Sequence, residues 1–222
     1  MPKVTSIGER AFQNCRTLTS VNLPVATSIG YGAFQNCEAL ASVSIPAADS
    51  IVDNVFQNCT ALASVSLPAT TFIGDEAFRG CEALTSISLP VVKSIGDGAF
   101  VGCDALTNVS LPATESIGNG AFGGCDALTS VSLPALTSIG EDAFYGCKLL
   151  SEIYVGKEPA MYIDDEIEAS DPHLRTLRTL RPLFMSHRDV LPHIKQLIFG
   201  QILNSSVKII IQHPPRKTNT IN

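Results

Sequence analysis

Residues 62–83 read LASVSLPATTFIGDEAFRGCEA, and residues 84–105 repeat the pattern as LTSISLPVVKSIGDGAFVGCDA. Phe, Cys, Pro and Leu each recur at a constant step of 22 residues through seven copies without an insertion. The recurring Phe residues are Phe12, Phe34, Phe56, Phe78, Phe100, Phe122 and Phe144. The recurring Cys residues, which are all the cysteines of the chain, are Cys15, Cys37, Cys59, Cys81, Cys103, Cys125 and Cys147. A fixed period of this length predicts a solenoid of stacked repeats.

The first half of each repeat predicts a short β-strand. In residues 64–67 the apolar Val65 and Leu67 alternate with serines, which places the apolar side chains on one face of a strand. Pro68 has no backbone N–H to donate to a neighbouring strand, so we expect the strand to end there.

The second half of each repeat has a different spacing. Ala77, Phe78, Cys81 and Leu84 are spaced as one face of a helical turn. The segment is too short for a stable helix, so we predict a single α or 3₁₀ turn.

Stacking is what allows such repeats to fold, because one repeat cannot bury its own apolar side and a neighbouring copy can. We therefore predict a β-lined right-handed solenoid over residues 1–155, made of seven repeats plus an eighth strand that contains Ile153. Its parallel strands should lie about 4.8 Å apart. The Phe and Cys series should then become structural ladders that run along the axis of the solenoid.

The third repeat departs from the pattern at two positions. Val52 stands where the other repeats have Gly, and Val55 stands where they have Ala. If the Gly has a positive φ, Val52 should strain this repeat.

Residues 156–222 form a tail that has no Cys and no trace of the repeat. Residues 174–181 and 189–203 predict short amphipathic helices, and residues 207–211 predict a strand, which together make a small mixed α/β region. Two hypotheses stay open for the tail, a cap over the last repeat and a disordered extension.

The string Leu-x-x-Val-x-Leu-Pro, followed by Ser-Ile-Gly-x-x-Ala-Phe-x-x-Cys, resembles the BspA-like class of leucine-rich repeats. The resemblance covers residues 2–155. It implies a surface or secreted protein that acts in adhesion or recognition, because members of this class are mostly such modules.

The residues that carry enzyme or metal chemistry are missing from the repeats. The cysteines are odd in number, none is in Cys-x-x-Cys spacing, and no His precedes residue 173. We therefore expect free buried thiols, no metal site and no cofactor. Residues 118–123 match the dinucleotide-binding pattern by letter, but they are one copy of the repeat without the βαβ context. No catalytic residue is predicted, and we expect that the protein is not an enzyme.

Charge and hydropathy exclude further classes. The net charge is −6, and residues 1–155 alone carry −8, which argues against nucleic acid as a partner. The N-terminus has no apolar segment of the kind found in signal peptides, and no stretch reaches the roughly 18 apolar residues of a membrane span. We therefore expect no membrane insertion.

The strand positions that face away from the core form the predicted partner-binding site. In a horseshoe-like solenoid this would be the concave face, where partners usually dock. We predict a non-enzymatic module that presents this face to a protein or glycan. The alternative is a structural element that associates end to end through uncapped ends. The predicted contact residues begin at Ser20 and Asn22 and continue with Ser42, Ser44, Ser64, Ser66, Ser86, Ser88, Asn108, Ser110, Ser130, Ser132, Glu152 and Tyr154.

Overall fold

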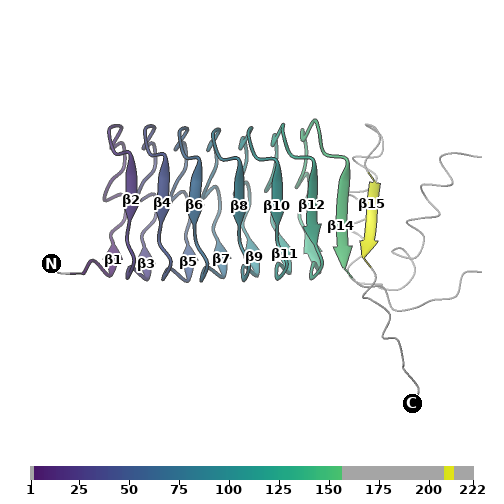
Figure 1. The fold of residues 1–222 in the computed structure, drawn as a ribbon, viewed down its shortest axis with the longest axis horizontal. Helices are drawn as coiled ribbons and strands as arrows, with labels where there is room; N and C mark the ends of the chain where they lie inside the picture. The colour runs from purple at the N-terminus through teal and green to yellow at the C-terminus, as the bar shows by residue number, and fades with distance from the viewer. Residues whose placement is uncertain (1–2, 157–207, 213–222) are drawn as a thin grey trace, which may run out of the picture.

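The computed structural model describes residues 3–156 and 208–212, and this part of the chain forms fifteen β-strands and no helix. The repeats wind into seven coils, of which coil 2 covers residues 24–45 and coil 7 covers residues 134–155 (Figure 1). Each coil contributes one strand to a back row and then one strand to a front row. The back row contains β1 (Ser6–Ile7), β3 (Ser28–Ile29), β5 (Ser50–Ile51), β7 (Phe72–Ile73), β9 (Ser94–Ile95), β11 (Ser116–Ile117) and β13 (Ser138–Ile139). The front row contains β2 (Ser20–Asn22), β4 (Ser42–Ser44), β6 (Ser64–Ser66), β8 (Ser86–Ser88), β10 (Asn108–Ser110), β12 (Ser130–Leu133), β14 (Glu152–Gly156) and β15 (Lys208–Gln212).

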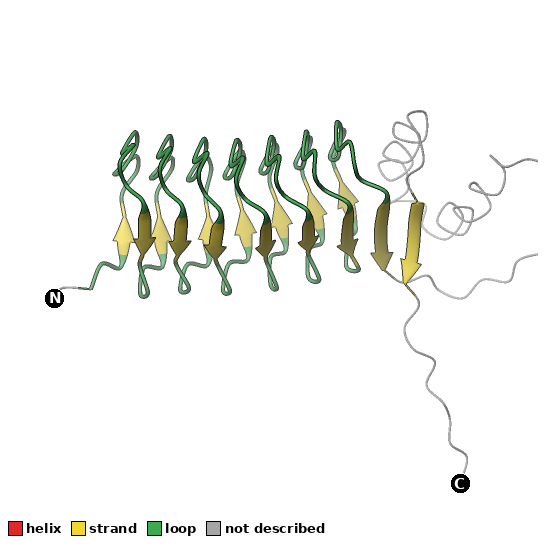
Figure 2. Cartoon of the chain, turned by 45° about the horizontal axis from the view of Figure 1, so that its top comes forward, coloured by secondary structure: helices red, strands yellow, loops and turns green. Residues whose placement is uncertain are grey.

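Strands of the same row pair in parallel with a register step of one repeat. Val109 of β10 lies opposite Ile87 of β8 and Val131 of β12. The coils follow one another in a nearly straight line in the two views of Figures 1 and 2. Stacked Phe rings of successive coils are within 10° of parallel at five of the six steps. The rod is therefore nearly straight, and the front row runs along it in a nearly straight line where the sequence predicted a concave face.

The Phe-containing segment of each coil is a series of turns, so the predicted α or 3₁₀ turn is wrong. In coil 4, Glu76 and Gly80 have positive φ values of 53° and 69°, which a right-handed helix does not allow. Some N–H groups bond within the coil, as Cys81 N–H does to Phe78 O at 3.1 Å. Others bond to the next coil, as Phe78 N–H does to Ala99 O at 2.8 Å. Because the N–H groups bond partly within their own coil and partly to the next coil, no continuous series of helical hydrogen bonds forms.

The core is a set of ladders along the rod axis. The centroids of successive Phe rings are 5.1–5.6 Å apart. The rings from Phe34 to Phe144 are at most 1% exposed, whereas Phe12 in coil 1 is 38% exposed. The Cys ladder runs beside the Phe ladder, with five thiols buried and Cys15 and Cys147 half-buried.

The back row is interrupted at Val52, for a reason that differs from the one the sequence suggested. The glycines at this position do not have positive φ. They are required because a Cβ at Gly74 would lie 2.6 Å from Asp53 N and 2.7 Å from Val52 C in the preceding coil. Gly74 N–H donates to Ile51 O at 2.7 Å, but the matching bond from Val52 to Ile29 is missing between these two described coils. The back row is accordingly divided between β3 and β5.

The front row is interrupted one step further along, between β6 and β8. The rings of Phe56 and Phe78, which belong to the same two coils, are tilted by 24° from parallel. Coil 3, residues 46–67, thus has one broken row on each of its two sides.

The tail contributes one strand to the front row. The predicted strand at residues 207–211 is β15, which pairs in parallel with β14 so that Ile209 lies opposite Ile153 (Figure 1). The predicted helices at residues 174–181 and 189–203 lie outside the described residues. The cap hypothesis therefore stays a prediction for the rest of the tail.

Candidate ligand-binding face

The outward side chains of the front row form the candidate site, which we call the strand face. In β8, Ser86 and Ser88 are exposed, and Ile87 between them points into the core and is 5% exposed. The same alternation in the other front strands from β2 to β12 presents two polar side chains from each coil. The apolar residue at the end of this segment is buried from coil 2 on, as Ile45 and Leu67 are, and a proline starts each of coils 2 to 7.

The parallel register aligns the strand face in two columns. The first column consists of Ser20, Ser42, Ser64, Ser86, Asn108, Ser130 and Glu152. The second column consists of Asn22, Ser44, Ser66, Ser88, Ser110, Ser132 and Tyr154. Neighbours on paired strands of a column are one strand spacing apart, about 4.8 Å, and the two columns are about 6.6 Å apart, two residues along a strand. Between β6 and β8 the strands are not paired. All the predicted contact residues are therefore brought together on one face.

With one exception, the serine hydroxyls of the strand face are left without protein partners. Among the described residues, only Ser130 donates a hydrogen bond from this set, to Asn108 Oδ1 at 3.5 Å. Three serines of the back row differ, because Ser116 donates to Ser94 Oγ at 2.9 Å and Ser50 donates to Asp49 Oδ1 at 3.1 Å. The strand face therefore offers a regular array of free donors and acceptors to solvent or to a ligand.

The C-terminal end of the strand face has a different chemistry. The hydroxyl of Tyr154 donates a hydrogen bond to Glu152 Oε2 at 2.6 Å. This hydrogen bond, with burial as a second cause, raises the pKa of Tyr154 above its ordinary value. Of the residues in the two columns, Glu152 is the first with a charged side chain and Tyr154 is the first with an aromatic one.

Comparison with known families agrees with the geometry of the coils. The sequence profile of the BspA type leucine rich repeat region matches the chain in six copies, over residues 1–91 and 71–167. The chain belongs to the BspA-type leucine-rich-repeat family. No curated protein matched the chain.

Two solved structures are similar to this BspA-type chain. A leucine-rich repeat protein from Bacteroides ovatus is 38% identical, with 69% of this chain and 43% of that chain covered and a TM-score of 0.63. The leucine rich repeat protein of T. pallidum is 33% identical, with 68% of this chain and 76% of that chain covered and a TM-score of 0.64. This chain thus spans less than half of the length of the B. ovatus protein.

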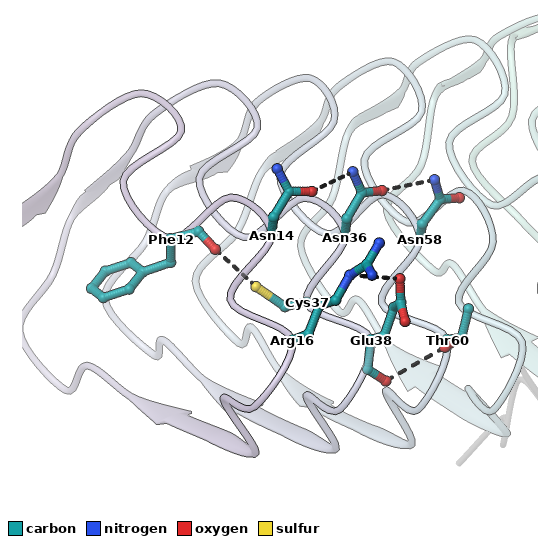
Figure 3. A network of polar contacts seen from close by, with 8 residues as sticks. All are labelled: Phe12, Asn14, Arg16, Asn36, Cys37, Glu38, Asn58 and Thr60. Carbon is teal, nitrogen blue, oxygen red and sulfur yellow. Dashed lines mark hydrogen bonds and ion pairs between the residues drawn. The ribbon is translucent and has the colours of Figure 1, made fainter.

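The thiols of the BspA-type coils are held in hydrogen bonds to the backbone. Each thiol from Cys37 onward donates to the carbonyl of the Phe in the preceding coil, as Cys37 Sγ does to Phe12 O at 3.0 Å (Figure 3). Burial raises the pKa of the Cys59 and Cys103 thiols to about 12. Because the thiolate is the nucleophile and the metal ligand, these buried thiols are inert near neutral pH.

The last thiol of the ladder differs from the others. The interaction between the two neighbouring thiols lowers the pKa of Cys147 and, together with burial, raises the pKa of Cys125. Cys147 is also half-buried, whereas Cys125 is fully buried.

Two polar ladders on the turns were not among the predicted residues. Asn58 donates to Asn36 and Asn36 donates to Asn14, each from Nδ2 to Oδ1 at 3.0 Å (Figure 3). In a second ladder Asp75 Oδ1 accepts from Asp97 N–H at 2.8 Å, and Asp53 Oδ1 accepts from Asp75 N–H at 3.0 Å. Their signal in the sequence is the same step of 22, and their contacts join coils to one another.

Proposed function

We propose that this chain is a non-enzymatic binding module that presents the strand face to a protein or a glycan. The observation that carries the proposal is the set of free, in-register hydroxyls, because ordered polar groups without protein partners are available to a ligand. The family supports the same function, since BspA-type repeats are generally surface or binding modules.

The experiment is a protein and glycan array probed with the full chain and with two variants. The double variant Ser66→Glu/Ser88→Glu adds two charges to the second column. Ser138→Glu/Ser28→Glu adds two charges to exposed serines of the back row and serves as the matched control. We expect the first variant to lose binding at least tenfold and the control to bind as the unchanged chain does. Equal binding by all three proteins would contradict the proposed face.

A location at the cell surface or outside the cell is part of the proposal and rests on the family. Within residues 3–156 and 208–212 there is no helix long and apolar enough to cross a membrane. Surface labelling of intact cells that express the tagged chain tests the location, and labelling only after lysis would contradict it.

A second candidate function is self-association through the end of the rod at coil 1. Phe12 is 38% exposed and stacks on Phe34 through one face, and Val21 and Leu23 are only half-buried. A second copy or a further coil of the same kind would cover these side chains. Size-exclusion chromatography over a dilution series tests this candidate. Phe12→Ser should abolish any concentration-dependent oligomer, and a monomer at every concentration would exclude the candidate.

A further inference from the structure

Over most of its length the strand face offers a ligand only weak hydrogen-bonding groups, which are repeated from coil to coil. From Ser20 to Ser132 the two columns contain only Ser and Asn side chains. Single sites that bind a protein tightly depend on Trp, Tyr or Arg, and none of these is in the two columns before Tyr154. A hydroxyl that gains one neutral hydrogen bond contributes little, on the order of a fivefold change in affinity. Affinity on this face must therefore come from repetition.

Repetition favours a ligand that has the same repeat as the rod. When identical sites are linked, each further contact forms within the complex, and the total affinity exceeds that of any single contact. This gain requires that the spacing of ligand groups match the step between coils, about 4.8 Å. The Phe rings are within 10° of parallel at every step except that between coils 3 and 4, where the tilt is 24° and the front row is interrupted. A straight ligand can therefore stay in register along the paired strands from β2 to β6, or along those from β8 to β12.

Polypeptides and charged polymers fit this array poorly. An extended polypeptide advances about 3.3 Å per residue, so its side chains do not stay in step with the coils. Polyanions are repelled by the net charge of −8 that residues 1–155 carry. Polycations find no carboxylate in the two columns before Glu152. These exclusions leave an uncharged polymer with hydroxyl groups and a short repeat.

We infer that the ligand of the strand face is an uncharged linear polysaccharide with equatorial linkages, which lies along the rod axis between the two columns. An equatorially linked pyranose chain is straight, and it advances by close to one coil for each sugar ring. Between the columns only the backbone of the central strand residue faces outward, because side chains such as Ile87 and Val109 point into the core. A ring in this position has one column on each side. This inference rests on the proposed function and names the class of ligand.

The test measures binding of the full chain to oligosaccharides of increasing length. Cello- and chito-oligosaccharides from disaccharide to octasaccharide are the probes, and malto-oligosaccharides, whose linkages make a curved chain, are the matched control. The dissociation constant should fall with each added sugar until the ligand spans the three paired front strands from β8 to β12, and then stay constant. The malto-oligosaccharides should bind at least tenfold more weakly at the longest length.

Two variants connect the length dependence to the array. A chain that lacks residues 90–111, which is one complete coil, should reach its constant affinity at a ligand one sugar shorter. Ser86→Ala/Ser88→Ala, which removes both outward hydroxyls of β8, should weaken binding of the longest ligand at least about fivefold, the effect of one hydrogen bond. Ser28→Ala/Ser138→Ala, which removes exposed hydroxyls from the back row, should bind as the unchanged chain does.

Three outcomes would overturn the inference. These are an affinity that is already constant at the disaccharide, equal binding of malto-oligosaccharides, and no binding of any oligosaccharide. If the array experiment instead finds a protein ligand that Ser66→Glu/Ser88→Glu abolishes, the proposed function stands and the polysaccharide is excluded.

Discussion

Coil 3 and coil 5 share the Phe and Cys ladders but have different backbone ladders. In coil 5, residues 90–111, β9 and β10 each pair with a strand on both sides. In coil 3, residues 46–67, β5 pairs only with β7 and β6 pairs only with β4. Phe56 and Phe100 are nevertheless both fully buried, and so are Cys59 and Cys103.

The comparison separates two kinds of constraint in the rod. The side-chain ladders pass through coil 3 without a gap, since each Phe needs only a ring above and a ring below. The backbone ladder is interrupted beside Val52, where the other coils have a glycine whose place has no room for a Cβ. The close approach of one coil to the next is therefore more sensitive to a single residue than the apolar core is.

The largest expected effect comes from what the two coils share, their buried thiols. The pKa of Cys59 and Cys103 is raised from 9.0 to about 12, so both thiols stay protonated in the folded chain while they ionise in the unfolded chain. Their contribution to stability is complete below about pH 9 and is lost as the pH rises toward about 12. Each thiol should lower the free energy of unfolding by about 1.4 kcal/mol per pH unit in this window.

Urea unfolding between about pH 8 and about pH 11 measures this slope. Cys59→Ala and Cys103→Ala should each reduce it by the amount that one thiol contributes. Because Tyr and Lys also titrate in this range, the difference between variant and unchanged chain is the informative quantity. A slope that neither substitution changes would show that the thiols are not protected from ionisation by the fold.

The second-largest effect is expected when the glycine of coil 5 is replaced by valine, the residue that coil 3 has at the same position. A Cβ at Gly96 would lie 2.7 Å from both Asp75 N and Gly74 C. Gly96→Val should therefore destabilise the chain by about 1–3 kcal/mol, as overpacking does, and should remove hydrogen-exchange protection from the amide of residue 96. Gly120→Asn is the control, because Asn54 occupies the same position of coil 3 with a φ of 60° and a Cβ at Gly120 meets no atom within 4 Å. A loss of stability from Gly120→Asn as large as that from Gly96→Val would refute the role of close approach.

The smallest effect is expected when Val52 of coil 3 is replaced by glycine, the residue that coil 5 has at the same position. Val52→Gly removes an overpacking cost of about 1–3 kcal/mol but adds the roughly 0.5–1 kcal/mol that glycine costs through its flexibility. The net gain should be about 1 kcal/mol, seen as a higher midpoint of urea unfolding. Val52→Ala keeps the Cβ and should give no gain. If Ala stabilises the chain as much as Gly does, bulk beyond the Cβ causes the interruption.

Much of the fold could be predicted from the sequence because the same local pattern occurs seven times. The alternation around Val65 placed serines outside and valines inside, and the step of 22 aligned them in columns. The Phe and Cys ladders follow from the same step. The candidate strand face was therefore predictable in its residues, since strand alternation and register depend on period alone.

The tertiary structure decided what depends on contact between coils. The turns around Phe78 are not helical, because their N–H groups bond partly to the next coil and two residues per coil have positive φ. Gly96 is required because a Cβ at this position would lie too close to Asp75 in the preceding coil, and not because of its φ. The sequence of a single repeat does not reveal this contact. The straight course of the strand face, its free hydroxyls and the pairing of β15 with β14 likewise depend on how separate segments meet. A period in the sequence specifies which residues share a face, and only the packed chain specifies how closely its coils approach.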